Sequence, residues 1–303
     1  MISARSLLFV PATSDRKIDK AYSSGADGVI LDLEDAVALS EKPAARAALA
    51  AIVAQPRLSP TWVRVNASTT PHCYADILAV CVPGIFGVVL PKAESAEEIR
   101  MIDWVMTQLE MARELPQGGI TLMAIVETAR GLEAVSAIAK SSPRLRRLVF
   151  GAVDLAADLG IDLEDDAGAT AQARFAIACA SCAAGIAAPM DTAFTNIQDL
   201  EALRATSIRA RGLGYRGKCC IHPVQVEVVN AVFTPSAEDI SRAQRIVAAF
   251  EAAERSGAAA VSMDGFMIDY PVADKARRLL ASVPGANGDR KPATEYHVKT
   301  SDV

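Results

Sequence analysis

The stretch Thr121–Thr128 reads TLMAIVET and decides the fold that the sequence predicts. Five apolar residues follow Thr121 without any alternation with polar residues, and the run stops at Glu127. A continuous apolar run is typical of a strand that is buried on both faces, as the strands of parallel sheets are. Glu127 is therefore expected at the carboxyl end of a parallel strand, where barrels and open α/β sheets place their chemistry.

A second stretch, Leu148–Asp154 (LVFGAVD), predicts a neighbouring strand that also ends on an acid. Carboxylates at two adjacent strand ends would offer hard oxygen ligands to one Mg²⁺ ion and leave positions for water and substrate. The alternative is that Glu127 and Asp154 are helix caps that follow βα turns. Position and ligand chemistry favour the metal site.

Strand-like and helical patterns alternate along the chain before residue 235. The predicted strands are Ser6–Pro11, Gly28–Leu33, Trp62–Asn66, Gly87–Pro91, Ile120–Thr128, Leu148–Asp154, Ala187–Phe194 and Cys219–His222. Eight successive β-then-α units in about this length predict an α/β fold of the (β/α)₈ TIM-barrel type.

The barrel is expected to span residues 1–234 and to carry a C-terminal helical extension and lid over residues 235–284. The amphipathic pattern of Ser236–Ser256 and the segment Pro271–Ser282 predict the two helices of this extension. Residues 285–303 are polar and are expected to form a flexible tail.

Composition narrows the classes of partner. The formal charge is −5 and no long basic run occurs, so neither nucleic acid nor an anionic membrane is an expected partner. No apolar stretch has the length of a membrane span or of a signal-peptide core. The six cysteines lack a secretory context and are interpreted as reduced thiols in the cytoplasm.

Two short motifs have bland interpretations. Cys179 and Cys182 form a C-x-x-C inside an Ala-rich helical pattern, and we interpret them as small core residues. The glycines of Gly212–Lys218 follow a helix and precede a strand, which is the reverse of the dinucleotide fingerprint. This segment is interpreted as a helix stop and a loop.

Charged residues of both signs are expected at the strand ends of one rim. They are Arg16, Lys20, Glu34, Asp35, Arg64, Lys92, Glu127, Asp154 and His222. This combination suits an anionic 2-oxo or 2-hydroxy acid chelated by a divalent metal. Arg64 would stabilise negative charge on the reacting oxygen, or it is a structural partner of Asp32 or Glu34, and the spacing leaves both roles open.

Seven motifs in fixed order resemble the citrate lyase β-subunit-like proteins of the HpcH/HpaI aldolase superfamily. They are RSLLFVPA, VILDLEDAVALSEKPAAR, RVN, VVLPKAES, IVETARG, GKCCIHPVQ and MDGFMIDYP, between Arg5 and Leu280. The resemblance implies a Mg²⁺-dependent barrel that cleaves or forms a carbon–carbon bond in a short 3-hydroxyacyl-CoA thioester. Citramalyl-, malyl- or citryl-CoA would give acetyl-CoA and a 2-oxo acid.

The resemblance also implies roles for the residues that match the family motifs. Glu127 and Asp154 match metal ligands, and Arg64 matches an arginine that binds substrate and stabilises an enolate. Glu34 and Asp35 match an acidic pair that holds metal-bound water and the rim.

Further matches concern the thioester and the proton donor. Arg16 and Lys20 match contacts to the acyl-carrier phosphates, and Ile221 and His222 line the same side. Asp269 matches an acid that a neighbouring subunit delivers to protonate the enolate, which implies a homo-oligomer, either a trimer or a pair of trimers. From the chain alone, this residue would be interpreted as part of a turn.

Two departures from the family weaken inference about the substrate. Val153 stands where many relatives have Glu, and Ala12 replaces a frequent Gly. Three other functions stay open: the β subunit of a multi-protein citrate lyase that acts on an acyl-carrier thioester, a non-catalytic 2-oxo acid-binding barrel, and an aldolase of non-thioester hydroxy acids.

Overall fold

The computed structural model describes residues 4–55, 57, 59–163, 168 and 170–283. The tail predicted over residues 285–303 lies outside the described residues. The chain divides into two compact units, the first up to Thr234 and the second from Pro235, and each is described by itself.

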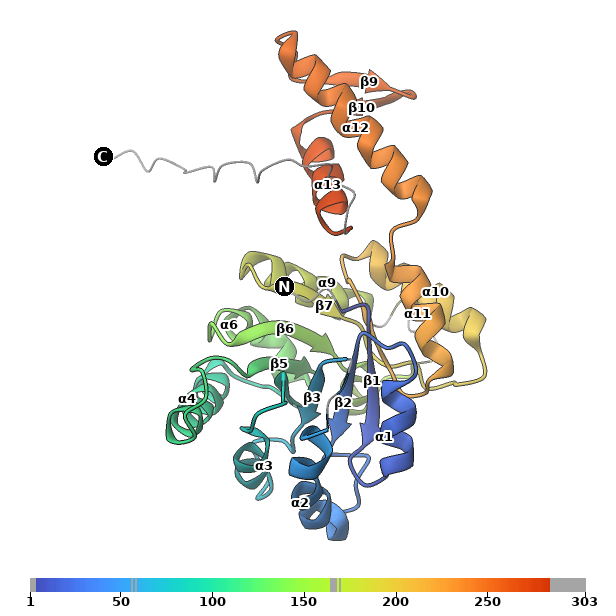
Figure 1. Cartoon of the computed structure of the whole chain (residues 1–303). Coiled ribbons are helices and arrows are strands. Elements are labelled where there is room, and N and C mark those ends of the chain that lie inside the picture. Colours follow the sequence, from blue (N-terminus) through green and yellow to red (C-terminus); the bar gives the residue numbers. More distant parts are fainter. Residues whose placement is uncertain (1–3, 56, 58, 164–167, 169, 284–303) are drawn as a thin grey trace, which may run out of the picture. The chain divides into compact units, whose positions relative to one another are not determined.

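The first unit is a barrel of eight parallel strands, which confirms the (β/α)₈ prediction (Figure 1). The strands are β1 Ser6–Pro11, β2 Gly28–Asp32, β3 Thr61–Arg64, β4 Gly87–Leu90, β5 Thr121–Val126, β6 Leu145–Phe150, β7 Ala187–Met190 and β8 Lys218–Cys220. Each strand from β1 to β6 pairs with the next in the chain, and β8 pairs with β1. A parallel bridge between Asp191 and Lys218 closes the ring between β7 and β8.

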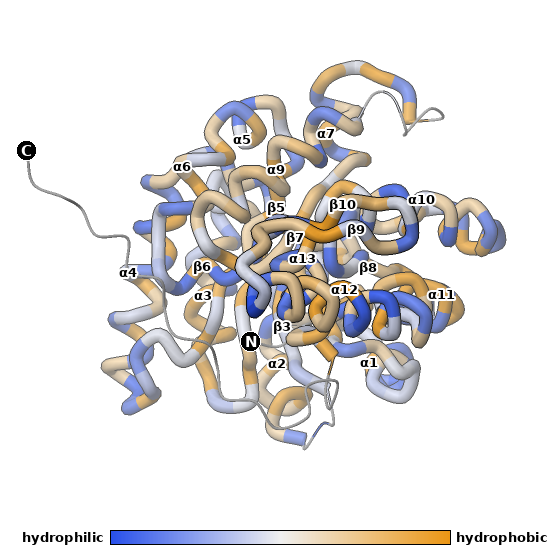
Figure 2. Tube along the Cα trace, turned by 90° about the horizontal axis from the view of Figure 1, so that it is seen from above, coloured by the Kyte–Doolittle hydropathy of each residue, from blue (hydrophilic) through white to orange (hydrophobic). Residues whose placement is uncertain are grey.

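Helices surround the strands and cover the outside of the barrel. They are α1 Asp15–Tyr22, α2 Lys42–Val53, α3 Cys73–Val80, α4 Ala96–Ala112, α5 Ala129–Glu133, α6 Val135–Ala139, α7 Ala152–Leu159, α9 Ala171–Ala183, α10 Leu200–Gly212 and α11 Val224–Phe233. Hydrophilic and hydrophobic residues alternate along α4 in Figure 2, because its buried residues, including Ile99, Ile102 and Met106, recur at helical spacing. In the described part of the chain no helix has both the length and the apolar character that a membrane crossing requires.

Strand β5 shows why its sequence is apolar without alternation. Leu122, Ala124 and Val126 belong to the large cluster between strands and helices. Met123 and Ile125 belong to a smaller cluster inside the barrel. Successive side chains of a strand point to opposite faces, and both faces of this strand are buried.

Three sequence interpretations are wrong at the level of local structure. Strand β6 ends at Phe150, and Asp154 stands in the first turn of α7 because the chain turns into a helix after Gly151. Strand β8 ends at Cys220, so Ile221 and His222 lie in the turn before α11. Apolar runs continue across both boundaries, and periodicity could not locate the change.

The third concerns the C-x-x-C pair, because Cys179 and Cys182 are exposed and do not belong to the core. Both stand on α9, where the buried face is formed by other residues, including Ala173, Ile177 and Ala180. An Ala-rich helix has little contrast between its faces, which is why the sequence did not distinguish them.

The second unit is a small helical element with a hairpin. Its elements are α12 Ala237–Arg255, β9 Val261–Met263, β10 Phe266–Ile268 and α13 Tyr270–Ala281. A capping box between Ser236 and Asp239 begins α12. Phe250 of α12 packs with Ile268 and Ala273. The sequence predicted both helices but not the antiparallel pairing of β9 and β10.

A buried carboxylate lies where the barrel closes between β7 and β8. Asp191 is fully buried and accepts hydrogen bonds from Arg174 Nε at 2.7 Å and from Lys218 Nζ at 2.5 Å. Asp191→Ala should lower the free energy of unfolding by about 3–5 kcal/mol, because it removes the carboxylate partner of a buried ammonium. Denaturant unfolding measures the loss.

The exposed Asp19, which pairs with Arg57 at the surface, supplies the control. Asp19→Ala should change the free energy of unfolding by less than about 1 kcal/mol, as exposed ion pairs do. Equal losses in the two variants would contradict the assignment of Asp191 as the closing carboxylate.

Candidate active site

Glu127 lies where the sequence places it, directly after β5 at the carboxyl end of the barrel. Its side chain is almost fully buried, and its Oε1 accepts a hydrogen bond of 2.8 Å from the main-chain amide of Lys92. Gly151 leaves room for this carboxylate, since a Cβ there would lie 2.4 Å from Glu127 Oε2. The neighbouring loops therefore determine where Glu127 stands.

Asp154 reaches the same rim from the first turn of α7. The N-terminus of this helix is held by the segment after β7, because Thr192 Oγ1 accepts a hydrogen bond of 3.1 Å from Ala152 N. Asp154 Oδ1 lies 3.7 Å from Lys92 Nζ. The structure thus brings Glu127 and Asp154 to the same lysine, one from a strand end and the other from a helix.

Arg64, the last residue of β3, is held by an acid that the sequence named only as an alternative. Its Nε and Nη2 donate to Asp32 Oδ1 and Oδ2 at 2.8 and 2.5 Å. Its guanidinium carbon lies 4.9 Å from the ring centre of Phe9. Nη1 lies 3.0 Å from Glu34 Oε2. A bidentate pair of this kind fixes the plane of the guanidinium group, so the structural partner role of Asp32 is present.

Glu34 and Asp35 stand together in the loop after β2. Glu34 is buried, and its Oε1 accepts a hydrogen bond of 2.7 Å from Lys92 Nζ. Glu34 Oε2 is buried and makes no hydrogen bond. The positively charged Arg64 Nη1 lies 3.0 Å from it and forms an ion pair with it. Asp35 is exposed and lies 3.9 Å from both Lys92 Nζ and Arg64 Nη1.

Burial and the neighbouring acids disfavour the ionised form of Glu127. Burial, with a further contribution from the charges of Asp154 and Glu34, raises the pKa of Glu127 to about 8, while Lys92 acts against that rise. Burial also raises the pKa of Glu34, against the charge of Arg64. The rim would therefore hold a proton or a cation more readily than an ordinary carboxylate pair.

A divalent metal fits the donors present. Glu127 and Asp154 offer carboxylate oxygens, and the buried Glu34 Oε2 makes no hydrogen bond, although it is ion-paired with Arg64 Nη1. Among the residues that the structure describes, no three or more His, Cys, Asp or Glu side chains are grouped to hold a metal ion. Water and substrate oxygens would have to complete the shell of a Mg²⁺ ion, as is usual for this metal.

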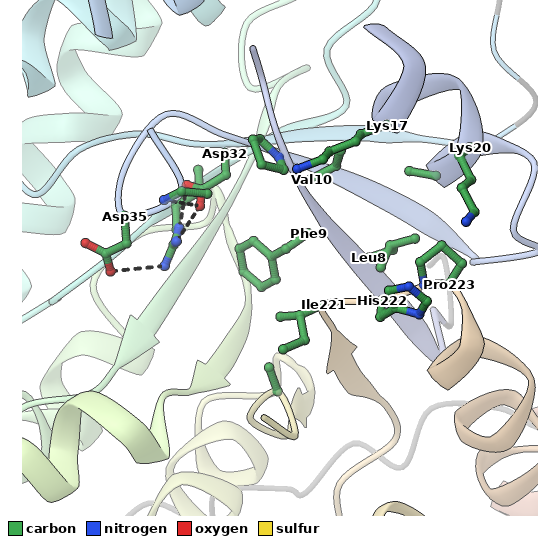
Figure 3. Close-up of a pocket in the computed structure, with 15 residues that line it drawn as sticks. Leu8, Phe9, Val10, Lys17, Lys20, Asp32, Asp35, Ile221, His222 and Pro223 are labelled. Carbon is green, nitrogen blue, oxygen red and sulfur yellow. Dashed lines mark hydrogen bonds and ion pairs between the residues drawn. The ribbon is translucent and has the colours of Figure 1, made fainter. Parts of the chain in front are cut away.

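A cavity of about 630 Å³ borders this rim at Asp35 and Arg64 (Figure 3). The predicted metal ligands Glu127 and Asp154 do not line it. Asp32 and Asp35 stand at one end in that view, and Lys20 and His222 at the other. Phe9 and Ile221 lie between them, together with other apolar residues of β1. The cavity therefore joins an acidic end, where Arg64 also lines it, to a basic end across an apolar middle.

The predicted substrate residues fall into two groups. Lys20, Ile221 and His222 line the cavity, whereas Arg16 is exposed on α1 and does not line it. Lys17 lines the cavity instead and was missed. Residues three apart lie on one face of a helix, so the position of Lys20 could have identified Lys17.

Asp269 belongs to the second unit, where it is the N-cap of α13. Its Oδ1 accepts a hydrogen bond of 3.3 Å from Val272 N. This is the local turn role expected from the chain alone. Its role toward a neighbouring subunit stays a prediction.

The chain is similar in sequence to known proteins over most of its length. A family model described as HpcH/HpaI aldolase/citrate lyase matches residues 5–223. Citrate lyase subunit beta of Leuconostoc mesenteroides subsp. cremoris is 36% identical over 278 residues, which cover 91% of this chain and 92% of that protein. The (3S)-malyl-CoA thioesterase of Cereibacter sphaeroides is 35% identical over 279 residues, which cover 91% of this chain and 93% of that protein.

A solved structure extends the likeness to three dimensions. The crystal structure of CitE from Mycobacterium tuberculosis in complex with magnesium, acetoacetate and coenzyme A matches with a TM-score of 0.76 and 34% identity. The match covers 93% of this chain and 98% of that chain. The likeness therefore includes most of the barrel and most of the sequence that follows it.

The raised pKa of Glu127 predicts how the stability of the metal-free protein depends on pH. The unfolded chain releases this proton near pH 4.5 and the folded protein near pH 8, so the folded state binds more protons between the two values. Stability should fall as pH rises through this window. In the presence of a chelator, Glu127→Gln should flatten the fall in Tm that wild-type protein shows between about pH 5 and 8.

The exposed Glu133 on α5 provides the matched control. Glu133→Gln should keep the wild-type dependence of Tm on pH. An unchanged slope in Glu127→Gln would show that the buried carboxylate does not titrate in this window.

Proposed function

We propose, on the premise that this chain belongs to the HpcH/HpaI aldolase/citrate lyase family and is a lyase, that it acts on a short 3-hydroxyacyl-CoA thioester with Mg²⁺ as cofactor. Citramalyl-, malyl- or citryl-CoA would be cleaved to acetyl-CoA and a 2-oxo acid, or formed from them. The observation that carries this proposal is the cavity that runs from Asp35 and Arg64, at the edge of the acidic rim, to the lysines of α1. The anionic carrier of a CoA thioester would suit the lysines at one end of the cavity, and its hydroxy-acid head, with a metal ion, would suit the acids and Arg64 at the other.

Glu127 and Asp154 would hold the metal. When bound, Mg²⁺ supplies a Lewis acid for the oxygens of the 2-oxo acid. Glu34 and Asp35 would bind water at the rim, because Glu34 Oε2 makes no hydrogen bond and Asp35 is exposed. The CitE protein of M. tuberculosis, whose structure is similar, was solved with magnesium, acetoacetate and coenzyme A.

Arg64 would stabilise the oxygen on which negative charge develops as the carbon–carbon bond breaks. Asp32 holds Nε and Nη2. Nη1 is paired with Glu34 Oε2 at 3.0 Å, and the substrate would share this nitrogen with that acid. An oriented, partly desolvated guanidinium contributes mainly in the transition state, because its orientation is already established. In cleavage a base removes the proton of the substrate hydroxyl, and the departing thioester becomes an enolate.

The basic end of the cavity would bind the carrier part of the thioester. Lys17 and Lys20 line it from α1, and His222 lines it from the turn before α11. Arg16 is exposed on the same helix and would contribute charge at longer range. Ile221 would contact the apolar part of the carrier.

Asp269 of a neighbouring subunit would donate the proton that the enolate carbon receives. This role requires a homo-oligomer, a trimer or a pair of trimers. Phe266 and Met267, in the hairpin just before Asp269, are largely exposed apolar residues within the second unit. Such residues suit a surface that becomes covered. The predicted cytoplasmic location is part of the same proposal.

A second candidate function is the β subunit of a multi-protein citrate lyase. The 36% identity to the Leuconostoc subunit favours it. In that case an acyl-carrier partner, rather than free CoA, would present the thioester to Lys20 and His222. A barrel that only binds a 2-oxo acid is disfavoured, because the acids and Arg64 converge on one rim.

The proposal predicts turnover of a free CoA ester by the purified chain. With Mg²⁺, at least one of malyl-, citramalyl- and citryl-CoA should be cleaved, and a chelator should abolish the reaction. Asp154→Ala should lose turnover with an unchanged Tm, because this acid is partly exposed. Glu133→Ala, which changes an exposed acid on α5, should keep turnover.

Failure on all three free esters, with turnover of an acyl-carrier thioester, would select the second function. Failure on both kinds of thioester would exclude lyase activity on this substrate class. Release of CoA without formation of a 2-oxo acid would instead identify thioester hydrolysis, which the name of the Cereibacter relative describes.

Subunit complementation tests the action of Asp269 in trans. Asp269→Asn keeps an N-cap residue at α13, so the helix should survive while turnover falls by about 10²–10⁴ as for a lost general acid. Mixing it with Asp154→Ala under subunit exchange should restore part of the activity. Restored activity would require an acid from one subunit and a metal site from another.

Fluorescently labelled subunits report exchange in the same mixture. No restored activity despite complete exchange would contradict action in trans, as would a fully active monomer.

A further inference from the structure

Lys92 occupies an unusual backbone position at the carboxyl end of β4. Its φ is 50°, in the left-handed region that residues other than glycine seldom adopt. Two hydrogen bonds to the neighbouring strand hold the turn. Lys92 N donates to Glu127 Oε1 at 2.8 Å, and Ala93 N donates to Ile125 O at 3.1 Å. The turn after β4 is therefore attached to β5 and to the residue that follows it, and the side chain of Lys92 points toward the acids.

The side chain of Lys92 contacts acids from the loop after β2 and from α7. Nζ donates to Glu34 Oε1 at 2.7 Å and lies 3.7 Å from Asp154 Oδ1 and 3.9 Å from Asp35 Oδ2. One residue thus meets four carboxylates, one through its amide and three through its ammonium group. These acids come from the loops after β2 and β5 and from α7.

The other cation at this rim has a different set of partners. Arg64 is paired with Asp32 and lies near Glu34 and Asp35. Within the described part of the chain, the ion pair of Asp154 is formed with Lys92. Lys92 is therefore the cation that joins the predicted metal ligands to the rest of the rim.

We propose that Lys92 is a positioning residue that acts as the resident cation of the acidic rim. It holds the carboxylates together before the metal binds, and its charge lowers the affinity of the rim for Mg²⁺. This inference rests on the metal site proposed above. Like charges a few ångströms apart repel, so an ammonium beside Asp154 opposes a second cation there. Without the ammonium, the carboxylates repel one another until a metal binds.

The test measures Mg²⁺ binding directly and does not rely on activity. Isothermal titration of chelator-treated protein with MgCl₂ compares wild type with Lys92→Met, which keeps length and removes charge. Lys92→Arg keeps the charge, and Lys140→Met removes an exposed charge on another loop. The affinity of Lys92→Met for Mg²⁺ should increase by about tenfold. Lys92→Arg and Lys140→Met should stay within about twofold of wild type.

Thermal unfolding supplies the second measurement. Metal-free Lys92→Met should have a Tm lower by about 2–4 °C, as for a modest loss of stability in a protein of this size. Saturating Mg²⁺ should restore most of the difference, because the metal replaces the missing charge. A residue that only supports the loop would give the lower Tm together with weaker Mg²⁺ binding.

Unchanged or weaker Mg²⁺ binding by Lys92→Met would overturn the inference, as would tighter binding by Lys92→Arg to the same extent. If wild-type protein binds no Mg²⁺ with or without pyruvate, both the metal site and this inference fail. If wild type binds Mg²⁺ and Lys92→Met binds it more tightly, but no thioester is cleaved, the proposed reaction fails and the role of Lys92 stands.

Discussion

Carboxylate repulsion is the constraint on which the rim depends. Glu34, Asp35, Glu127 and Asp154 converge there, and burial adds to the unfavourable energy of the inner two. The chain offsets this energy with the fixed charges of Arg64 and Lys92, both of which contact the acids through ion pairs. The four acids exceed the two cations in charge, so the site attracts a further positive charge, which a divalent ion can supply.

The closure of the barrel and the geometry of the rim are linked through the end of β7. Asp191 closes the ring toward β8, and the next residue, Thr192, caps the helix that carries Asp154. Asp158 near the end of the same helix accepts a hydrogen bond of 2.8 Å from Ala129 N, two residues after Glu127. The two predicted metal ligands are therefore positioned by contacts that run around the ring.

The sequence predicted the architecture because burial on both faces leaves a clear record in strands such as β5. It also predicted the position of Glu127, since an acid that follows such a strand lies at the carboxyl end of the barrel. It did not predict that Asp154 lies on a helix, because GAVD continues an apolar run through a change of backbone conformation. Lys92 was placed on the rim without a role, since its positive φ and its amide bond to Glu127 are properties of the folded chain.

Part of the cavity lining lies outside the rim, so some of its shape can change without a change in the rim. The acids are bound to one another through Arg64 and Lys92, so changing one of them disturbs the others. Val153 precedes Asp154 but is exposed on the first turn of α7. Phe9 and Ile221 line the cavity between its charged ends. Substitutions at these three positions would remove no carboxylate or cation of the rim, although a change of Phe9 would also remove the ring that lies beside Arg64. The shape of the cavity can therefore change while the charged groups of the rim stay the same.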